Sequence, residues 1–306
     1  MIANQLPLLR RELWEHRAIY VTPLVIGLLI ALMAITGQAT ISANHHVVEL
    51  ALWGAAYMEE AQRAAMITAM TFGIAGLLAL AMLALAVFYC LDALYAERKD
   101  RSILFWRSMP VTDAETVVSK LVTALFVIPL VTCAVTFATH LVVLATASAW
   151  MAVHGANPWD LLWSTAPLGE IWLATLAFFI GMPLWLSPFA GWFLLVSAWT
   201  RRSPLLLGFL PIVVLPMLEK SLIGSRVLAD AFFQRSVEMP LFRGLGAGPF
   251  MLRGDALLEG DALSSGILSR LDVAGFVTSP GLWLGLLACA LLTAGAIWLR
   301  RYRDDS

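Results

Sequence analysis

The sequence predicts an all-α integral membrane protein with six transmembrane helices, and two observations carry that prediction. Of its 306 residues, 60% are apolar and 13% are charged, whereas a soluble domain is about 45–50% apolar and about 25% charged. The apolar residues also gather in runs that can cross about 30 Å of hydrocarbon, which takes about 20 helical residues. This composition excludes a cytosolic enzyme, a nucleic-acid-binding protein and a disordered chain, and residues 1–306 are expected to form one transmembrane domain.

Six apolar runs are long enough to be considered as spans. They cover residues 18–36, 64–91, 121–149, 171–199, 205–218 and 281–299. Pro183 and Pro188 are expected to kink or break the fourth span, because proline cannot donate a helical hydrogen bond. The fifth run is short and contains Pro211 and Pro216, which is compatible with a partly re-entrant helix.

Basic residues are unevenly distributed between the two sides of this topology. Six spans put both ends of the chain on one side, where thirteen basic residues fall: Arg10, Arg11, Arg17, Arg98, Lys99, Arg101, Arg107, Lys120, Arg201, Arg202, Arg300, Arg301 and Arg303. The other side has Arg63 and six more in a connection of about 60 residues, near the length at which the positive-inside rule loses force. Both termini are therefore expected in the cytoplasm.

Residues 4–17 precede the first span and are expected to form an amphipathic helix in the membrane interface. Leu6, Leu9 and Leu13 recur at the spacing of one helix face. The remaining faces carry the charged residues Arg10, Arg11, Glu12, Glu15 and Arg17. A simple topological anchor and a mechanical role are both open for this helix.

The loop 92–120, between the second and third spans, holds the densest cluster of charge. Residues 92–108 contain no helix breaker, so we expect a cytoplasmic helix in which Glu97 and Arg101 pair at i, i+4. Residues 103–106 form an apolar block within this charged segment. Pro110 then ends the helix by restricting the residue before it.

The next helix is expected to begin at a capping box formed by Thr112 and Glu115. The chain would thus build a short helix, a sharp turn and a re-entry, with Phe105 and Trp106 exposed. An aromatic knob on a cytoplasmic helix is typical of a side chain that fills a socket on a soluble partner. The alternative is that both rings lie flat on the lipid interface.

This loop resembles the cytoplasmic loop of type-two ABC (ATP-binding cassette) transporter permeases. The resemblance rests on Glu97-Arg98, on Arg101-Ser102-Ile103, on Met109-Pro110-Val111 and on Lys120 at the foot of the next span. The rest of the chain is consistent with that family: an N-terminal interfacial helix, six spans and a long outer connection. Many relatives carry Gly where this sequence has Arg101.

The resemblance implies the permease subunit of an exporter that moves its substrate by alternating access. Its coupling helix would contact the ATPase through Glu97, Arg98, Arg101, Ser102, Phe105, Trp106, Pro110 and Val111. The implied partners are two cytosolic ABC ATPase subunits, a second copy of this permease or a related one, and the lipid bilayer, with no nucleic acid. The implied location is the bacterial inner membrane. The outer connection 219–280 would form short external helices, as a lid on the translocation path or as a structural cap.

The sequence has no motif for covalent chemistry of its own. It lacks G-x-x-x-x-G-K-[ST], H-E-x-x-H, G-x-S-x-G and C-x-x-C, so we expect a non-enzymatic subunit without a cofactor, with ATP and Mg bound by the partner ATPase. Metal binding is not expected. His45 and His46 are adjacent and point to different sides of an element, so with Glu49 they make a weak ligand set.

The spans contain few ionisable residues, which argues against a secondary transporter because a coupling ion needs a charged site near the midplane. A scaffold or sensor that binds another partner is a further alternative. In the third span Thr132, Thr136, Thr139 and His140 fall near one face. These hydroxyls either bond to carbonyl groups of their own or a neighbouring helix or line a substrate path.

Overall fold

The computed structural model describes residues 5–100, 111–237, 239–241 and 267–302. Within these ranges all regular secondary structure is helical, which confirms the all-α prediction. Six helical segments are long and apolar enough to cross a membrane: Ala18–Ser42, Glu60–Lys99, Asp113–Val153, Leu168–Trp185, Pro204–Leu222 and Pro280–Tyr302. The predicted number of candidate spans is therefore confirmed.

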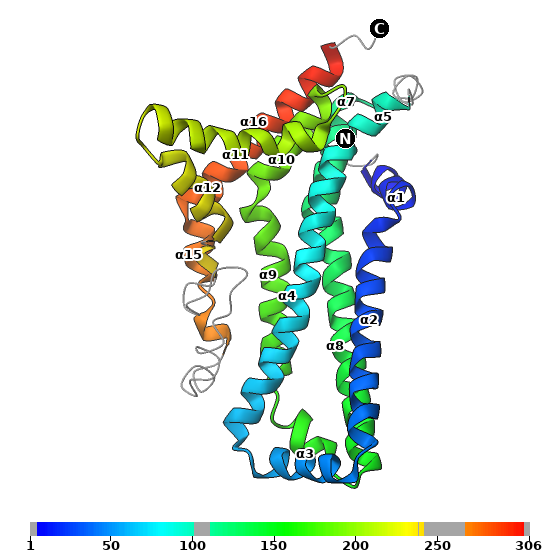
Figure 1. Cartoon of the computed structure of the whole chain (residues 1–306). Helices are drawn as coiled ribbons and strands as arrows, with labels where there is room; N and C mark the ends of the chain where they lie inside the picture. The colour runs from blue at the N-terminus through cyan, green and yellow to red at the C-terminus, as the bar shows by residue number, and fades with distance from the viewer. Residues whose placement is uncertain (1–4, 101–110, 238, 242–266, 303–306) are drawn as a thin grey trace.

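Four long helices run side by side and form the main bundle (Figure 1). They are α2 (Ala18–Ser42), α4 (Glu60–Asp92), α8 (Ile128–Val153) and α9 (Leu168–Trp185). Helix α3 (His45–Tyr57) lies across the end remote from the chain termini. Near that end the chain also forms the π-helical turn η3 (Trp159–Trp163) between α8 and α9.

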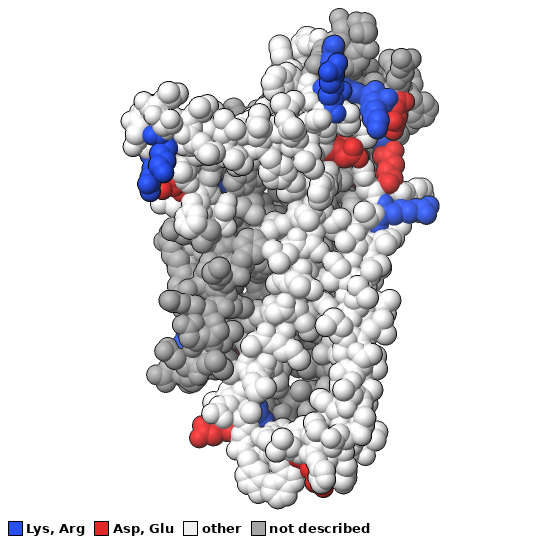
Figure 2. All heavy atoms as spheres, in the orientation of Figure 1, with Lys and Arg blue, Asp and Glu red and all other residues white. Residues whose placement is uncertain are grey.

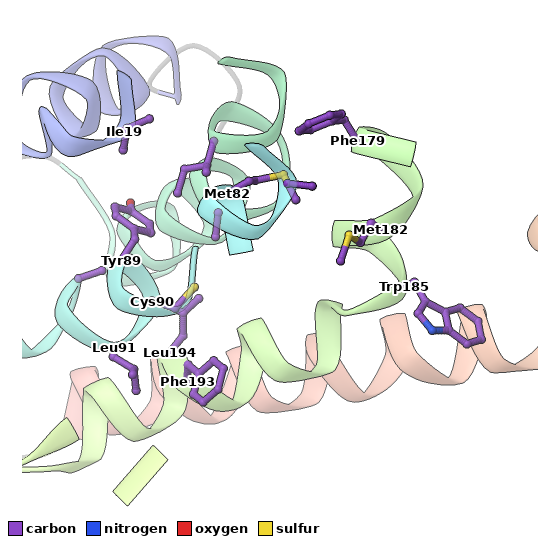
Figure 3. Close-up of a cluster of buried hydrophobic side chains, with 14 of the residues drawn as sticks. Ile19, Met82, Tyr89, Cys90, Leu91, Phe179, Met182, Trp185, Phe193 and Leu194 are labelled. Atoms are coloured by element: carbon purple, nitrogen blue, oxygen red, sulfur yellow. The ribbon is translucent and has the colours of Figure 1, made fainter. Parts of the chain in front are cut away.

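The third span begins with α7 (Asp113–Val122) and passes through the π-helical turn η2 (Thr123–Val127) before α8. Pro129 stands at the start of α8 and has no N–H for the carbonyl four residues earlier, which favours a π-turn at this point. The bundle core includes Met82 of α4 and Phe179 and Met182 of α9, all fully buried (Figure 3).

The outer surface of the bundle is apolar along its length. On α2, for example, Leu24, Leu28 and Leu32 are exposed at helical spacing. Figure 2 shows the charged side chains gathered mainly toward the two ends of the molecule, with uncharged side chains between them. A helical bundle with this surface fits hydrocarbon on its sides and water at its ends.

The expected fourth span is two helices. Helix α9 ends at Trp185, and α10 (Ser187–Trp199) starts again after Leu186, so the predicted break at Pro183 and Pro188 is confirmed. Only α9 runs along the bundle. Helix α10 lies across the bundle at the end where both termini lie, and α11 (Pro204–Leu222), the expected fifth span, lies crosswise beside it (Figure 1).

The last long helix, α16 (Pro280–Tyr302), packs along α10. The two backbones approach closely at Gly191, where an added Cβ atom would lie 3.0 Å from the carbonyl oxygen of Cys289. The described part of the connection before α16 contains three short helices: α12 (Val227–Val237), η5 (Leu268–Arg270) and α15 (Val273–Thr278). The prediction was of short external helices in this connection, and the described helices lie to one side of the bundle (Figure 1).

Candidate functional site

The predicted coupling segment is described at both of its ends. It starts in α5 (Tyr95–Lys99), at the same end of the molecule as the termini (Figure 1), and it resumes at Val111, which is half-buried. Five of the predicted coupling residues lie outside the described residues: Arg101, Ser102, Phe105, Trp106 and Pro110. The predicted Glu97–Arg101 pair therefore lies outside them too.

The capping box after this segment is confirmed. The backbone N–H of Glu115 donates to Thr112 Oγ1 at 3.2 Å, and the backbone N–H of Thr112 donates to Glu115 Oε2 at 3.0 Å. Each side chain thus satisfies a backbone group of the other, which fixes the first turn of α7. The capping box therefore fixes where the coupling segment ends and where the first helix of the third span begins.

Glu97 does not point outward from α5, and its carboxylate is buried at the centre of an ion-pair network. It is 3.1 Å from Nζ of Lys120 on α7, and it accepts a hydrogen bond from Nη1 of Arg300 on α16. Arg300 also donates from Nε to Asp113 Oδ1 at 2.9 Å. Nη2 of Arg11, on the first helix, lies 3.6 Å from Glu97. The carboxylate of Glu97 thus links α5 to Arg300, which lies more than 200 positions later in the chain.

The second carboxylate of this network is Glu12, on α1 (Gln5–Glu15). Glu12 was expected among the charged residues on the faces of this helix away from the leucines, but its side chain is 1% exposed. Its Oε1 accepts from Lys120 Nζ at 3.0 Å and its Oε2 accepts from the hydroxyl of Tyr89 at 2.7 Å. Leu8, one turn earlier, is buried as well, so α1 is anchored by a face that the leucine spacing did not identify.

Among the described residues, the core of the network joins three carboxylates and three cations. It consists of Glu12, Glu97, Asp113, Arg11, Lys120 and Arg300. Removing charge from water is costly, so such a buried cluster is stable only when each charge has close partners of opposite sign. The network therefore makes the positions of α1, α5, α7 and α16 depend on one another.

Arg98 ties the same segment to α10. Its Nη2 donates to the carbonyl oxygens of Ser197 and Thr200, the latter at 2.8 Å, at the C-terminal end of α10. These carbonyls have no helical donor, and a cation there also interacts favourably with the helix dipole. The hydroxyl of Ser197 accepts from the backbone N–H groups of Leu94 and Tyr95 at 3.1 and 3.0 Å. The start of the coupling segment is thus fastened to α10 by several bonds.

The four residues considered for a substrate path are all buried in the third span. The hydroxyls of Thr132, Thr136 and Thr139 donate to carbonyl oxygens four residues earlier in their own helix, at 2.8 to 2.9 Å. Nε2 of His140 lies 2.9 Å from the carbonyl oxygen of Thr71. The structure therefore shows the hydrogen bonds to carbonyl groups that were one of the two predicted roles. The other role, lining of a substrate path, stays a hypothesis.

Two groups of side chains contain potential metal ligands. His45 and Glu49 are exposed, with 3.4 Å between Nε2 and Oε1, and no third ligand from the described residues joins them. Glu12, Glu15 and His16 bring three ligand atoms within 4.8 Å of one another. The oxygens of Glu12 already accept hydrogen bonds from Lys120 and Tyr89, so this cluster belongs to the ion-pair network.

Sequence reasoning missed most of this network. Lys120 was recognised as the basic residue at the foot of the third span, Arg300 only as a cytoplasmic charge, and Glu12 only as one of the charges on the remaining faces of the first helix. One feature of the sequence indicated that Glu12 is buried. Leu8 lies four residues before Glu12, so the two side chains share one face of the helix, and burial of Leu8 brings Glu12 with it. The partners of Glu12 are far away in the chain, and no spacing rule reaches them.

Comparison with known proteins gives one match. Residues 62–155, about a third of the chain, match the family model described as ABC-2 family transporter protein. This region holds most of α4, the coupling segment, α7 and α8. No curated protein and no solved structure matches the chain. The match therefore shows an ABC-2 family domain over residues 62–155 and, together with the six apolar helices, supports a multi-pass membrane permease of the ABC type.

Proposed function

We propose that this permease is the transmembrane subunit of an ATP-driven exporter and moves its substrate by alternating access. Two cytosolic ATPase subunits bind ATP and Mg, and the permease acts as a pair, either with a second copy or with a related permease. The chain itself performs no covalent chemistry. Closure of the ATPases moves the coupling segment, which shifts the spans between inward-open and outward-open states.

The observation that carries this proposal is the attachment of the coupling segment to three other elements. Glu97 joins it to α16 through Arg300 and to α7 through Lys120. Arg98 joins it to the end of α10. A displacement of α5 would therefore be passed on to α7, α10 and α16, because stretching these buried contacts is costly.

The distribution of charge supports an orientation with both termini in the cytoplasm. Both termini, α5 and the ion-pair network lie at the same end of the molecule (Figure 1), and the basic side chains shown in Figure 2 are most crowded there. Toward the opposite end the described basic residues are fewer: Arg63, whose guanidinium donates to the carbonyl oxygens of Ala55 and Met58, and Arg270 of η5, next to the start of α9. This asymmetry is the one that the positive-inside rule describes for a bacterial inner membrane.

The test replaces the aromatic knob of the coupling segment. Phe105→Ala together with Trp106→Ala should leave membrane insertion intact and either release the ATPase or abolish transport-linked ATP hydrolysis, since aromatic anchors dominate such interfaces. The measurements are co-purification of the ATPase with the permease and substrate-stimulated ATP turnover in proteoliposomes.

A matched control is available at the other end of the molecule. Trp53 and Tyr57 are exposed on α3 and stack at 5.3 Å, and replacing both with Ala removes a similar aromatic area away from the ATPase. The control should keep the ATPase and its turnover. Normal turnover and co-purification in the Phe105/Trp106 variant would show that the coupling assignment is wrong.

A further inference from the structure

Arg235, on α12, places a cation in apolar surroundings. Its guanidinium carbon is 4.1 Å from the ring centre of Trp185, and its Nη1 donates to the carbonyl oxygen of Gly281 at 2.6 Å. Its Nε and Nη2 are shielded from solvent and have no hydrogen-bond partner among the described residues. Burial lowers the pKa of Arg235 to about 10, so the side chain stays charged at neutral pH. The charged guanidinium of Arg235 therefore has two N–H groups without an acceptor among the described residues.

The position of this guanidinium is fixed by the residues around it. The indole N–H of Trp185 donates to the carbonyl oxygen of Arg235 at 2.8 Å, which holds the backbone of α12 against the bend between α9 and α10. On α16, a Cβ atom at Gly285 would overlap Nη2, and a Cβ at Gly281 would lie 3.7 Å from Nη1. The glycines thus leave the space that the guanidinium fills. Figure 3 shows Trp185 beside α16.

Arg235 lines a cavity of about 700 Å³ between α9, α10, α11, α12 and α16. Aromatic and aliphatic side chains form most of its wall, including Trp185, Phe189, Trp192 and Leu215, and Arg235 is the one charged residue among the described residues that line it. A second cavity of about 320 Å³ shares Phe189 and Ile212 with the first and is lined almost wholly by apolar side chains. The two cavities therefore adjoin, with the cation in the larger one.

We propose that these cavities bind an amphipathic anion, with its carboxylate or phosphate at Arg235 and its hydrocarbon against the aromatic wall. The binding site rests on the geometry alone, and its interpretation as the substrate class of the exporter rests on the proposed function.

Three properties of the site select this ligand chemistry. The guanidinium lines the cavity, and a movement of its side chain that uncovers Nε and Nη2 would present a planar fork that matches a carboxylate or phosphate group through two parallel charge-assisted bonds. An ionisable side chain surrounded by apolar groups in a membrane protein is a functional position by default, since leaving it unpaired is costly. A cavity of this size also falls within the range of sites that enclose small ligands, about 300–1,000 Å³. A neutral hydrophobic ligand would leave the cation unpaired, and a small hydrophilic anion would leave the aromatic wall empty.

The test measures equilibrium binding of radiolabelled dodecyl phosphate to the full-length permease in phosphatidylcholine nanodiscs, without the ATPase. Binding is corrected for partitioning into empty discs. Dodecanol has the same chain without the anion, so it serves as the matched probe. Arg235→Gln removes the cation, Arg235→Lys keeps the charge without the fork, and Arg226→Gln is the control because Arg226 is an exposed cation of the same connection.

The wild-type protein should bind dodecyl phosphate at least about tenfold more tightly than dodecanol, as expected for a charge-assisted hydrogen bond. Arg235→Gln should lose that preference, Arg235→Lys should keep part of it, and Arg226→Gln should be unchanged. Equal wild-type affinity for the two probes would overturn the proposal, and that comparison needs no variant to fold. Equal affinity of wild type and Arg235→Gln for dodecyl phosphate would overturn it as well.

A further arm identifies the source of the anion. Discs that contain phosphatidylglycerol supply an anionic lipid headgroup, and competition with dodecyl phosphate there would identify a membrane lipid as the occupant. Unchanged binding in those discs would identify a solute that reaches the cavity. Both results support the anion site. Because the ATPase is absent, failure of this experiment is separate from failure of the coupling test at Phe105 and Trp106.

Discussion

Replacing Glu97 with Gln tests whether the ion-pair network holds the permease together. The substitution keeps the size of the side chain and removes one negative charge from a site where Lys120 and Arg300 are its close partners. Side chains of both partners are at most 4% exposed, so neither can recover its hydration without movement of the helices. The variant thus leaves two buried cations with less than their full countercharge.

The size of the effect follows from the burial of this pair. Breaking a buried pair by removing one partner costs about 3–5 kcal/mol. An exposed partner contributes about 0–1 kcal/mol, and Glu15 is such a partner of Arg11, because the side chain of Glu15 is 45% exposed. Glu15→Gln is therefore the matched control. We expect Glu97→Gln to lower the midpoint of thermal unfolding by about 10 °C and Glu15→Gln to lower it by about 2 °C or less.

The chain provides its own reporter for this measurement. Its three cysteines, Cys90, Cys133 and Cys289, are all free and buried. A dye that becomes fluorescent on reacting with thiols therefore reports unfolding of the permease in detergent as temperature rises.

A double substitution distinguishes a network from a general loss of packing. Glu97→Gln with Lys120→Gln removes one charge of each sign. The double variant should therefore lose less free energy of unfolding than the sum of the losses of the two single variants. An unfolding midpoint for Glu97→Gln equal to that of Glu15→Gln would refute the reasoning, because it would show that Glu97 is solvated or unpaired in the protein.

The remaining predictions concern other contacts. Gly191→Val should lower the unfolding midpoint and weaken α10–α16 packing, measured with cysteine crosslinks across the two helices, because its side chain would meet the backbone of α16. Arg98→Ala should leave expression intact but lower ATP-coupled transport, whereas Arg98→Lys should restore part of it; equal transport would contradict the tie to α10. Burial lowers the pKa of His16 from 6.5, so its contribution to stability is present above pH 6.5 and is lost as pH falls, and His16→Gln should flatten this dependence. Thr136→Val with His140→Ala should change substrate transport if these residues line a path, and unchanged transport would remove that hypothesis.

Much of the helical framework could be predicted from the sequence. Apolar runs marked the six candidate spans, prolines marked the break near Leu186, and Thr112 with Glu115 marked the start of α7. Each of these features depends on residues close together in the chain. Local spacing is therefore enough to find them.

The network and the cavity could not be predicted in the same way. Glu12 and Lys120 are 108 residues apart, and Glu97 and Arg300 are 203 apart, so their pairing depends on how helices cross. The crosswise direction of α10 and α11 likewise depends on tertiary packing and not on composition. Gly281 and Gly285 carry no sign in the sequence that an arginine from α12 fills the space beside them.

The span of the Glu97 contacts along the chain also constrains how the permease is made. Synthesis runs from the N-terminus, so α1, α5 and α7 enter the membrane region before Arg300 exists. Until α16 is inserted, Glu97 and Asp113 lack their partner on that helix, Arg300. The last span therefore completes the ion pairs of the network as well as the helix packing. A nascent permease without α16 would expose to cellular quality control a charged site that is buried in the finished protein.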